Sequence, residues 1–332
     1  QSRRSVFSRF SDRSQAVMLN GRVSTYGDFL NRLVGQLGPG HQEDVKGQGL
    51  RILTGTVTSP TLARLMNKVL ERFPRARWCQ YDPVSRHAGR AGAKLAFGAE
   101  AEPVHDFNRA DVVVALDADF LGRGPARIPE ARAFAARREA TAMTRLYAAE
   151  SMYTITGSMA DHRLAVPSRT IAALLLTLAH DLGVKAAPTP AVAPDAAGRA
   201  WLAAVRKDLE AHRGSSLVLV GDDQPAELHA VAHLINEALG NVGKTVEFID
   251  PVVAAPKRAE QAETLAELAA EMKNNAVETL LILDSNPVYT APVDLDFAHL
   301  LDRVPFSAHV GLYQNETADH CRWHVPMAHA LE

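Results

Sequence analysis

The chain has few cysteines and no long apolar run, and each absence excludes a class of protein. Its 332 residues include only two cysteines, Cys79 and Cys321. Two thiols cannot build the four-thiolate sites that iron–sulfur clusters and structural zinc usually need. The longest apolar stretches, 171–179 and 280–283, are far shorter than the roughly 20 residues that span a bilayer. We therefore expect no cluster within these residues and no direct membrane insertion.

An excess of charge of one sign is also missing, since 36 basic residues stand against 38 acidic ones. No overall field favours nucleic acid, so we expect no nucleic-acid partner. Hydrophobic residues make up 47% of the chain, which at this length is enough for two buried cores. The chain begins with Gln1 and not Met, and we expect it to be a piece of a longer protein.

Apolar segments of strand length alternate with helical segments along most of the chain. Residues 50–55, 111–116, 216–220 and 279–283 are typical of strands buried on both faces of a parallel sheet. The alternation predicts an α/β fold with two doubly wound, mostly parallel Rossmann-like sheets. Three prolines between 186 and 195 indicate a linker. The expected parts are an N-terminal arm, hairpin and helix (1–44), a first α/β domain (45–188) and a second (189–332).

Polar residues directly after the predicted strands form the candidate site, because ligands of doubly wound sheets bind at the carboxyl ends of the strands. The loop 55–59 precedes a helix whose first N–H groups could hold an anion. Its candidate cofactor contacts are Gly55, Thr56 and Ser59. The loop lacks the G-x-G-x-x-G pattern, which disfavours a dinucleotide.

Acidic residues follow three other predicted strands, and one of these ends also has an asparagine. The candidates are Asp117, Asp119, Asp222, Asp223, Asp284 and Asn286. Carboxylates at these positions would repel a pyrophosphate unless a cation intervened. The same acids could instead cap helices or bind a divalent cation, and the sequence leaves these interpretations open.

The segment 240–245 (Gly-Asn-Val-Gly-Lys-Thr) is not predicted to bind phosphate. A P-loop needs a glycine where Ala238 stands, and it lies between a strand and a following helix. Here the segment follows a predicted helix and precedes a predicted strand. Gly240 is therefore interpreted as a glycine that ends a helix.

Two other polar groups could support chemistry, but neither leads to an assigned site. The loop 156–163 has acid–base residue types without a nucleophile signature. The last stretch gathers possible metal ligands whose simpler interpretation is exposed or partner-facing side chains: His309, His320, Cys321, His324 and His329. We assign no catalytic residue and no metal ligand, and we expect Cys79 to be a core residue.

Several segments resemble the molybdopterin oxidoreductase superfamily, which includes formate dehydrogenase and DMSO reductase. Residues 283–287 (Leu-Asp-Ser-Asn-Pro) are similar to a Gly-x-Asn-Pro turn that follows a strand in that family. Residues 235–244 are similar to its LN-x-LLGN-x-GKPGG segment, with Thr245-Val246 in place of the last glycines. Residues 317–332 resemble its teTa…ADVVLP…E segment. The resemblance implies the family's two central domains along residues 45–332.

Within that superfamily the chain resembles the molybdopterin-oxidoreductase-like, iron–sulfur-containing subunit of alternative complex III. This subunit of the bacterial quinol:electron acceptor oxidoreductase is often labelled an Fe-S-cluster-containing hydrogenase component. The similar segments occur in the same order along both chains: 12–17, 21–22, 117–121, 145–147, Glu150, 156–157 and 160–164.

This resemblance implies a scaffold without the molybdenum cofactor, for which the acid-rich strand ends offer a physical reason. The molybdenum ligand and the N-terminal cysteine motif of the catalytic relatives have no match here. It implies iron–sulfur clusters in a domain beyond Glu332. The implied partners are that domain and other subunits of a membrane-bound quinol-oxidising complex of respiratory or photosynthetic electron transfer. The implied location is peripheral, on the periplasmic side of the bacterial inner membrane. By itself the fragment would not be catalytic. The alternative is an oxidoreductase domain that binds a molybdopterin guanine dinucleotide or another nucleotide between its two α/β domains.

Overall fold

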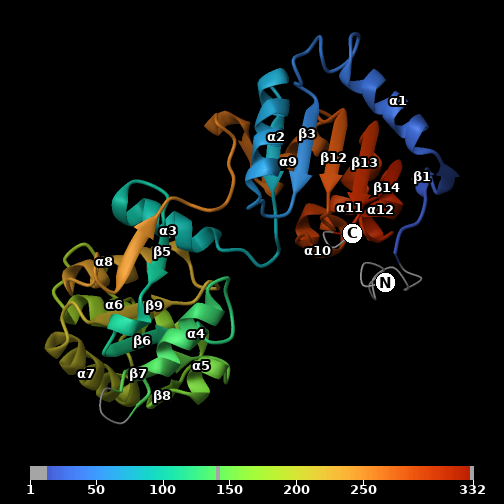
Figure 1. Ribbon diagram of the computed structural model, residues 1–332. Coiled ribbons are helices and arrows are strands. Elements are labelled where there is room, and N and C mark those ends of the chain that lie inside the picture. Colours follow the sequence, from blue (N-terminus) through green and yellow to red (C-terminus); the bar gives the residue numbers. More distant parts are fainter. Residues whose placement is uncertain (1–12, 140–142, 330–332) are drawn as a thin grey trace. The chain divides into compact units, whose positions relative to one another are not determined.

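The computed structural model describes residues 13–139 and 143–329 and forms two units (Figure 1). The first unit combines residues 1–84 with 253–332, and the second contains residues 85–252. No helix of the described residues is long and apolar enough to cross a bilayer.

The first unit is built on an eight-stranded sheet. In sheet order its strands are β11 (Ala262–Glu263), β4 (Arg77–Gln80), β3 (Leu50–Thr54), β12 (Thr279–Leu283), β13 (Phe306–Gly311), β14 (Trp323–Pro326), β1 (Val17–Leu19) and β2 (Arg22–Ser24). The first six are parallel, and the hairpin β1–β2 adds two antiparallel strands at one edge. The apolar runs of β3 and β12 therefore lie at the centre of the sheet, where each strand has a hydrogen-bonded strand on either side.

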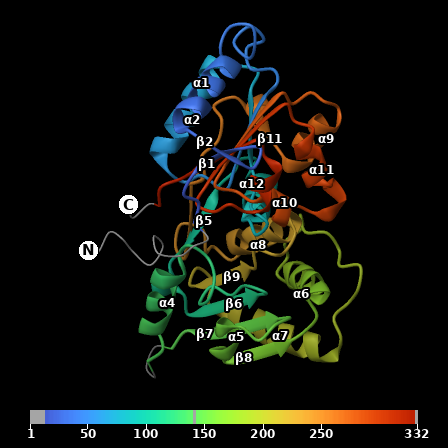
Figure 2. The ribbon, with the colours of Figure 1, turned by 90° about the vertical axis from the view of Figure 1, so that its right-hand side faces the viewer.

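Helices pack on both faces of this sheet, but unequally (Figure 2). One face carries α9 (Leu265–Lys273), α10 (Pro287–Thr290), α11 (Phe297–Asp302) and α12 (Glu316–His320). The other carries α1 (Tyr26–Leu37) and α2 (Pro60–Arg72). Both of the latter begin at a side-chain cap, since the side chains of Thr25 and Ser59 accept hydrogen bonds from the backbone N–H groups of the first turns.

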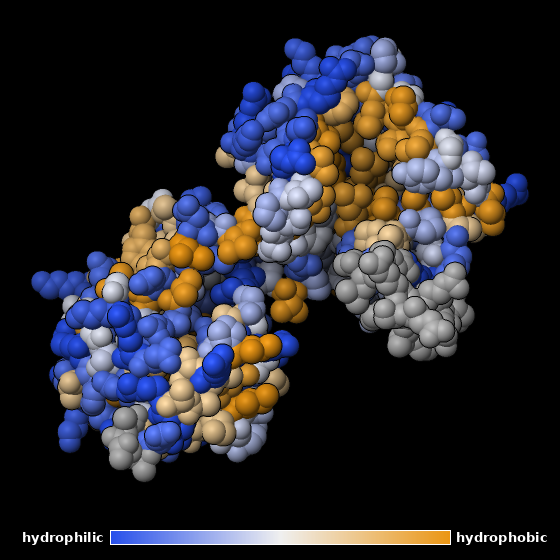
Figure 3. All heavy atoms as spheres, viewed as in Figure 1, coloured by the Kyte–Doolittle hydropathy of each residue, from blue (hydrophilic) through white to orange (hydrophobic). Residues whose placement is uncertain are grey.

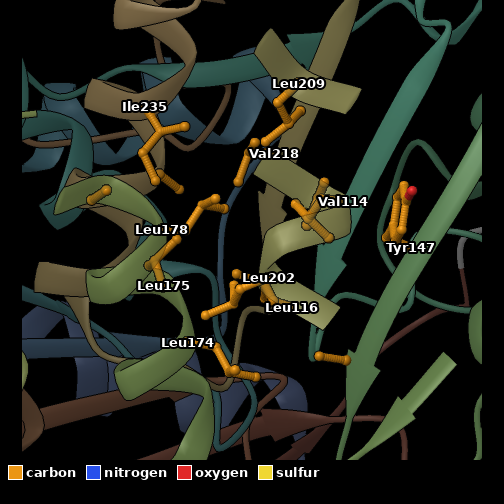
Figure 4. Packing of buried hydrophobic residues seen from close by; sticks show 14 of the residues in the cluster. Val114, Leu116, Tyr147, Leu174, Leu175, Leu178, Leu202, Leu209, Val218 and Ile235 are labelled. Carbon is orange, nitrogen blue, oxygen red and sulfur yellow. The ribbon is translucent and has the colours of Figure 1, made fainter. Parts of the chain in front are cut away.

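The second unit contains a four-stranded parallel sheet and a two-stranded ribbon. The sheet order is β8 (His162–Ala165), β7 (Arg145–Glu150), β6 (Val112–Leu116) and β9 (Ser216–Val220), and the ribbon pairs β10 (Val246–Ile249) with β5 (Glu102–His105). The helices are α3 (His87–Phe97), α4 (Arg127–Ala136), α5 (Ile155–Ser158), α6 (Ser168–Asp181), α7 (Ala196–Ala211) and α8 (Ala226–Ala238). Leucines of α6 and α7 pack against β6 and β9 in the larger core (Figure 4).

The predicted α/β class with two mostly parallel sheets is confirmed, but the chain divides differently from the predicted 45–188 and 189–332. Strand β3 pairs with β12, which lies more than two hundred residues later in the chain. Residues 85–252 are inserted between β4 and β11 as a separate unit. The proline-containing stretch 186–195 is only the connection between α6 and α7 inside that unit. Of the expected N-terminal part, 1–44, residues 17–24 form the edge hairpin and residues 26–37 form α1 of the first unit, whereas residues 1–12 of the expected arm lie outside the described residues.

Candidate functional site

The loop that follows β3 is filled by the chain's own side chains. The backbone N–H of Thr56 donates to the Asp82 carboxylate at 2.7 Å, and the N–H of Val57 donates to the Gln80 side-chain oxygen at 2.9 Å. The Ser59 hydroxyl accepts the N–H of Leu62. Two backbone donors of the loop and one in the first turn of α2 are thus already engaged. An anionic ligand would have to displace a carboxylate that reaches the loop from the next strand.

Gly55 permits this arrangement by its small size. A Cβ atom at this position would lie 3.1 Å from the nearest carboxylate oxygen of Asp82. A side chain at this position would therefore push the Asp82 carboxylate away by a few tenths of an ångström.

The loop after β12 holds the other two candidates of this unit, and it lies beside the first because β3 and β12 are neighbours. The side-chain oxygen of Asn286 accepts from the Thr317 N–H at 3.2 Å and from its hydroxyl at 2.7 Å, and its amide donates to Glu316 at 2.8 Å. Asn286 thus fastens the start of α12. Asp284 has a left-handed backbone (φ 49°), and its carboxylate makes no hydrogen bond to another described residue.

A small polar pocket of about 180 Å³ opens where β12 and β13 end. Its lining is Asp284, Ser285, Asn286, His309, Gly311, Leu312, Tyr313 and Asn315. A Cβ on Gly311 would lie 2.5 Å from the His309 ring, so the ring occupies the space that this glycine leaves. The pocket contains both candidates of the β12 loop and six residues that the sequence had not assigned to a site.

His309, which lines this pocket, contacts a second buried histidine, His324. His309 Nδ1 lies 3.0 Å from His324 Nδ1, and the rings stack with centroids 5.2 Å apart. The Ser14 hydroxyl contacts Nε2 of His324. Burial, followed by the charge of His324, lowers the pKa of His309 to about 4, and burial lowers the pKa of His324 as well. Both rings are therefore neutral at pH 7, with one Nδ1 donating and the other accepting.

The other residues of the histidine-rich stretch separate. His320 ends α12 and contacts Asp302 at 2.9 Å, so it does not share a strand face with His324. Cys321 is buried, and burial raises the pKa of its thiol to about 12. Within residues 13–139 and 143–329, no three His, Cys, Asp or Glu side chains converge in a way that could hold a metal. Cys79 is fully buried in the core, as predicted.

In the second unit, Asp117 connects the ends of the sheet strands. One carboxylate oxygen accepts from the N–H and hydroxyl of Ser151 at 2.8 and 3.2 Å. The other accepts from the Ser168 hydroxyl at 2.8 Å and from the Gln224 amide at 2.9 Å. Gly221 makes room for this turn, since a Cβ there would lie 1.9 Å from the Asp117 carbonyl oxygen. Asp117 is thus an internal acceptor at the junction of three segments.

Asp119 has the same kind of role two residues later. One of its oxygens accepts from the N–H of Thr156 at 3.0 Å and from its hydroxyl at 2.8 Å. The Thr156 hydroxyl in turn accepts the N–H of Leu121 at 3.1 Å. The carboxylate therefore satisfies donors at the first turn of α5, which is the capping interpretation of these acids.

The two aspartates after β9 lie beside arginines at the surface. Asp222 lies 3.6 Å from Arg86, and Asp223 lies 3.1 Å from Arg123. Pairs this exposed contribute little to stability. Their neighbouring cations nevertheless offset the negative field that was predicted for this sheet edge.

The loop 156–163 also uses its polar residues internally. Asp161 forms two 2.8 Å hydrogen bonds with the Arg138 guanidinium and accepts the N–H of Leu146. His162 stacks on Tyr147 with centroids 4.8 Å apart. Asp161 and His162 therefore make contacts within the fold and do not form an acid–base pair. The segment 240–245 lies between α8 and β10, and Gly240 has a φ of 71°, as predicted for a glycine that ends a helix.

A second cavity, of about 500 Å³, lies between α6 and α7 and contains none of the predicted site residues. It is lined by Thr177, Asp181, Arg199, Leu202, Ala203, Arg206, Lys207 and Glu210. Its charged residues partly neutralise each other, since Arg206 donates to Glu210 at 3.0 Å.

Comparisons with known proteins identify the fold but show no family for this chain. No family model matches the chain, and no curated protein matches it. The structure is similar to acetylene hydratase from Pelobacter acetylenicus, with a TM-score of 0.67 and 12% identity over 97% of this chain. This chain spans 56% of that one. It is also similar to a chain of the formyltransferase/hydrolase complex (FhcABCD) from Methylorubrum extorquens, which was solved in complex with methylofuran. The TM-score is 0.59 at 15% identity, and the similar region covers 94% of this chain and 86% of that one. At such identities the likeness shows the fold alone, which is an α/β fold of a kind found in enzymes.

Proposed function

We propose that the chain is the cofactor-free scaffold portion of a molybdopterin-oxidoreductase-like subunit in a quinol-oxidising electron-transfer complex. Such a scaffold would support a cluster-bearing domain and dock onto other subunits. It would lie on the periplasmic side of the bacterial inner membrane and be peripheral through its partners. The redox centres would reside outside these residues.

The observation that carries this proposal is the carboxylate of Asp82 on the Thr56 N–H at 2.7 Å. It occupies the first loop of the sheet edge where a doubly wound fold binds an anionic ligand. With Val57 engaged by Gln80, the residues present do not fit a pyrophosphate in this loop. Asp117 and Asp119 support the same conclusion in the other unit, because their carboxylate oxygens accept hydrogen bonds from other residues of the chain.

The rival function is an oxidoreductase domain that binds a molybdopterin guanine dinucleotide or another nucleotide. The pocket after β12 and β13 is the feature that favours it, since Asp284 and Asn286 line a polar cavity there. Its volume of about 180 Å³ is below the roughly 300–1,000 Å³ of ordinary ligand sites. A pocket of this size suits a few waters or a small polar molecule better than a dinucleotide.

Molybdenum and pterin content test the proposal. The protein would be purified from a host that makes molybdopterin guanine dinucleotide, with a molybdenum enzyme prepared in parallel as the positive control. We expect metal and pterin well below one equivalent per chain. Stoichiometric molybdenum accompanied by a guanine dinucleotide would refute the cofactor-free scaffold and favour the rival.

A further inference from the structure

One face of the sheet in the first unit is left partly uncovered by the topology. The crossovers from β11 to β12 and from β12 to β13 both run over the face that holds α9 and α11 (Figure 2). Among the described residues, the opposite face receives only α2, which packs on β3 and β4, and α1, which packs on β13 and β14. No crossover therefore places a helix over β12 on this side, although sheets of this class are normally covered on both faces.

The floor of the uncovered strip is apolar. Leu281, Leu283 and Val310 are only partly buried, whereas Leu280 and Ile282 on the other face of β12 are fully buried. Figure 3 shows a hydrophobic hollow on this face of the first unit, between the two helices. We call this hollow the α1–α2 groove, with Leu281, Leu283 and Val310 as its floor.

The groove walls are also apolar and exposed. Helix α1 has an exposed apolar residue at every fourth position: Tyr26, Leu30 and Val34, which are 59, 38 and 69% exposed. They lie on the same side of the helix as Leu37. Leu37 packs into the cluster around α2, which shows that this side faces the groove. The facing wall is Leu65 of α2, which is 46% exposed. An apolar surface formed jointly by two helices and a sheet marks an interaction site more than scattered apolar residues do.

A helix fits this groove better than a strand. Strands β12 and β13 already have hydrogen-bonded neighbours on both sides, so an added extended segment would find no backbone partner on the floor. A helix satisfies its own backbone and needs only apolar contacts. Helix α2 lies over the midpoint between β3 and β4, and α1 lies over the midpoint between β13 and β14. These midpoints are three strand spacings, or about 14 Å, apart. This separation is wider than the roughly 8–10 Å between the axes of directly packed helices. An amphipathic helix can therefore sit between and above α1 and α2.

The rim of the groove on α2 is basic. Arg64 and Lys68 flank Leu65, and neither forms an ion pair with a described carboxylate. A partner helix with acidic residues along one flank would complement this rim. A second copy of the chain would place two basic rims against each other in any two-fold contact that sets α2 against α2.

We infer that the α1–α2 groove docks one amphipathic, acidic-flanked helix of about 12–15 residues from a partner subunit. This length matches the 12 and 13 residues of the two wall helices. The inference rests on the proposed function only in treating the chain as a docking scaffold. A chain found to contain molybdenum would refute that function and leave the groove untouched.

The test uses a fluorescein-labelled 14-residue peptide with leucines at positions 1, 4, 8 and 11 and glutamates along one flank. Two matched peptides replace either the leucines by alanine or the glutamates by lysine. The protein variants are Leu65→Glu in the groove wall and Arg64→Glu/Lys68→Glu on its rim, with Val293→Glu as a control at a residue that is 89% exposed elsewhere in the same unit. Circular dichroism checks that each variant folds, which is expected because all four side chains are exposed.

We expect the leucine–glutamate peptide to bind and to shift the methyl signals of Leu281 and Leu283. Leu65→Glu should weaken binding at least tenfold, Val293→Glu should change it less than twofold, and the double rim variant should reverse the preference to the lysine peptide. Equal binding of the alanine peptide, or no loss in Leu65→Glu, would overturn the inference. Absence of binding together with dimerisation that Leu65→Glu abolishes would identify a second copy as the occupant and overturn it as well.

Discussion

Replacement of Asp117 by alanine tests whether the acids at the strand ends are structural. This side chain accepts from Ser151, Ser168 and Gln224, which belong to different segments of the second unit. A hydrogen bond to a charged group contributes about 1.5–3 kcal/mol, less where water can replace it. Alanine also tolerates the φ of 51° less well than aspartate does, by about 1 kcal/mol. For a half-buried carboxylate we expect a loss of about 4 kcal/mol in the free energy of unfolding.

The matched control is Asp223→Ala, since this carboxylate has one exposed partner, Arg123 at 3.1 Å. Its loss should be below about 1 kcal/mol. Asp117→Asn should fall between the two, because it keeps the tolerance for a left-handed backbone but loses the charge. Urea unfolding followed by circular dichroism gives the three values, and hydrogen exchange in β6 assigns them to the second unit. Equal small losses for Asp117→Ala and Asp223→Ala would refute the structural role of Asp117.

Three further outcomes follow from the same contacts. Gly221→Ala should destabilise by at least about 3 kcal/mol in urea unfolding, because its Cβ would meet the Asp117 carbonyl, whereas Gly35→Ala, which meets nothing within 4 Å, should be neutral or slightly stabilising. The unfolded chain takes up a proton at His309 below pH 6.5 and the folded chain only near pH 4, so stability present above pH 6.5 should fall by about 3 kcal/mol as the pH drops to 4. His309→Asn should flatten that slope, and parallel pH curves for the variant and the parent protein would contradict the assignment. Thermal shift with and without a chelator should show no difference; a chelator-dependent drop would indicate a divalent cation on the paired aspartates.

The helices and strands could be predicted closely because their signals are local. The predicted strands 216–220 and 279–283 coincide with β9 and β12. Helix α9 begins at Leu265, because Thr264 and Glu267 form a capping box there. The local pattern of apolar residues thus indicates which segments form helices or strands, and individual capping side chains determine where the helices begin.

The division into units could not be predicted from local pattern. It depends on the pairing of β3 with β12, and nothing in either apolar run specifies its neighbour. The proline-containing stretch 186–195 is a reasonable linker by composition, but both helices that flank it pack in the same core. Composition indicates where the chain turns, and only the sheet order decides which turns separate units.

The candidate site was only half predictable. The residues after the strands do lie at the sheet edges, yet the sequence could not distinguish acids that repel a ligand from acids that cap the chain's own donors. Asp82 was missed, although a signal existed: β3 and β4 are consecutive strands, and adjacent parallel strands end at the same edge. A residue just after β4 is therefore within reach of the loop after β3.

The most direct test of the central claim is a titration with guanosine diphosphate, observed at the backbone N–H signals of residues 55–59 in the ¹⁵N-labelled protein. We expect no saturable shift of the Thr56 or Val57 N–H signals at millimolar nucleotide, because both N–H groups donate to side chains of the chain itself, Asp82 and Gln80. Asp82→Ala, which removes the internal anion, serves as the comparison and should show larger shifts. A saturable shift of the Thr56 N–H signal in the unmodified protein would contradict the claim that the chain's own side chains occupy the backbone donors of the loop after β3.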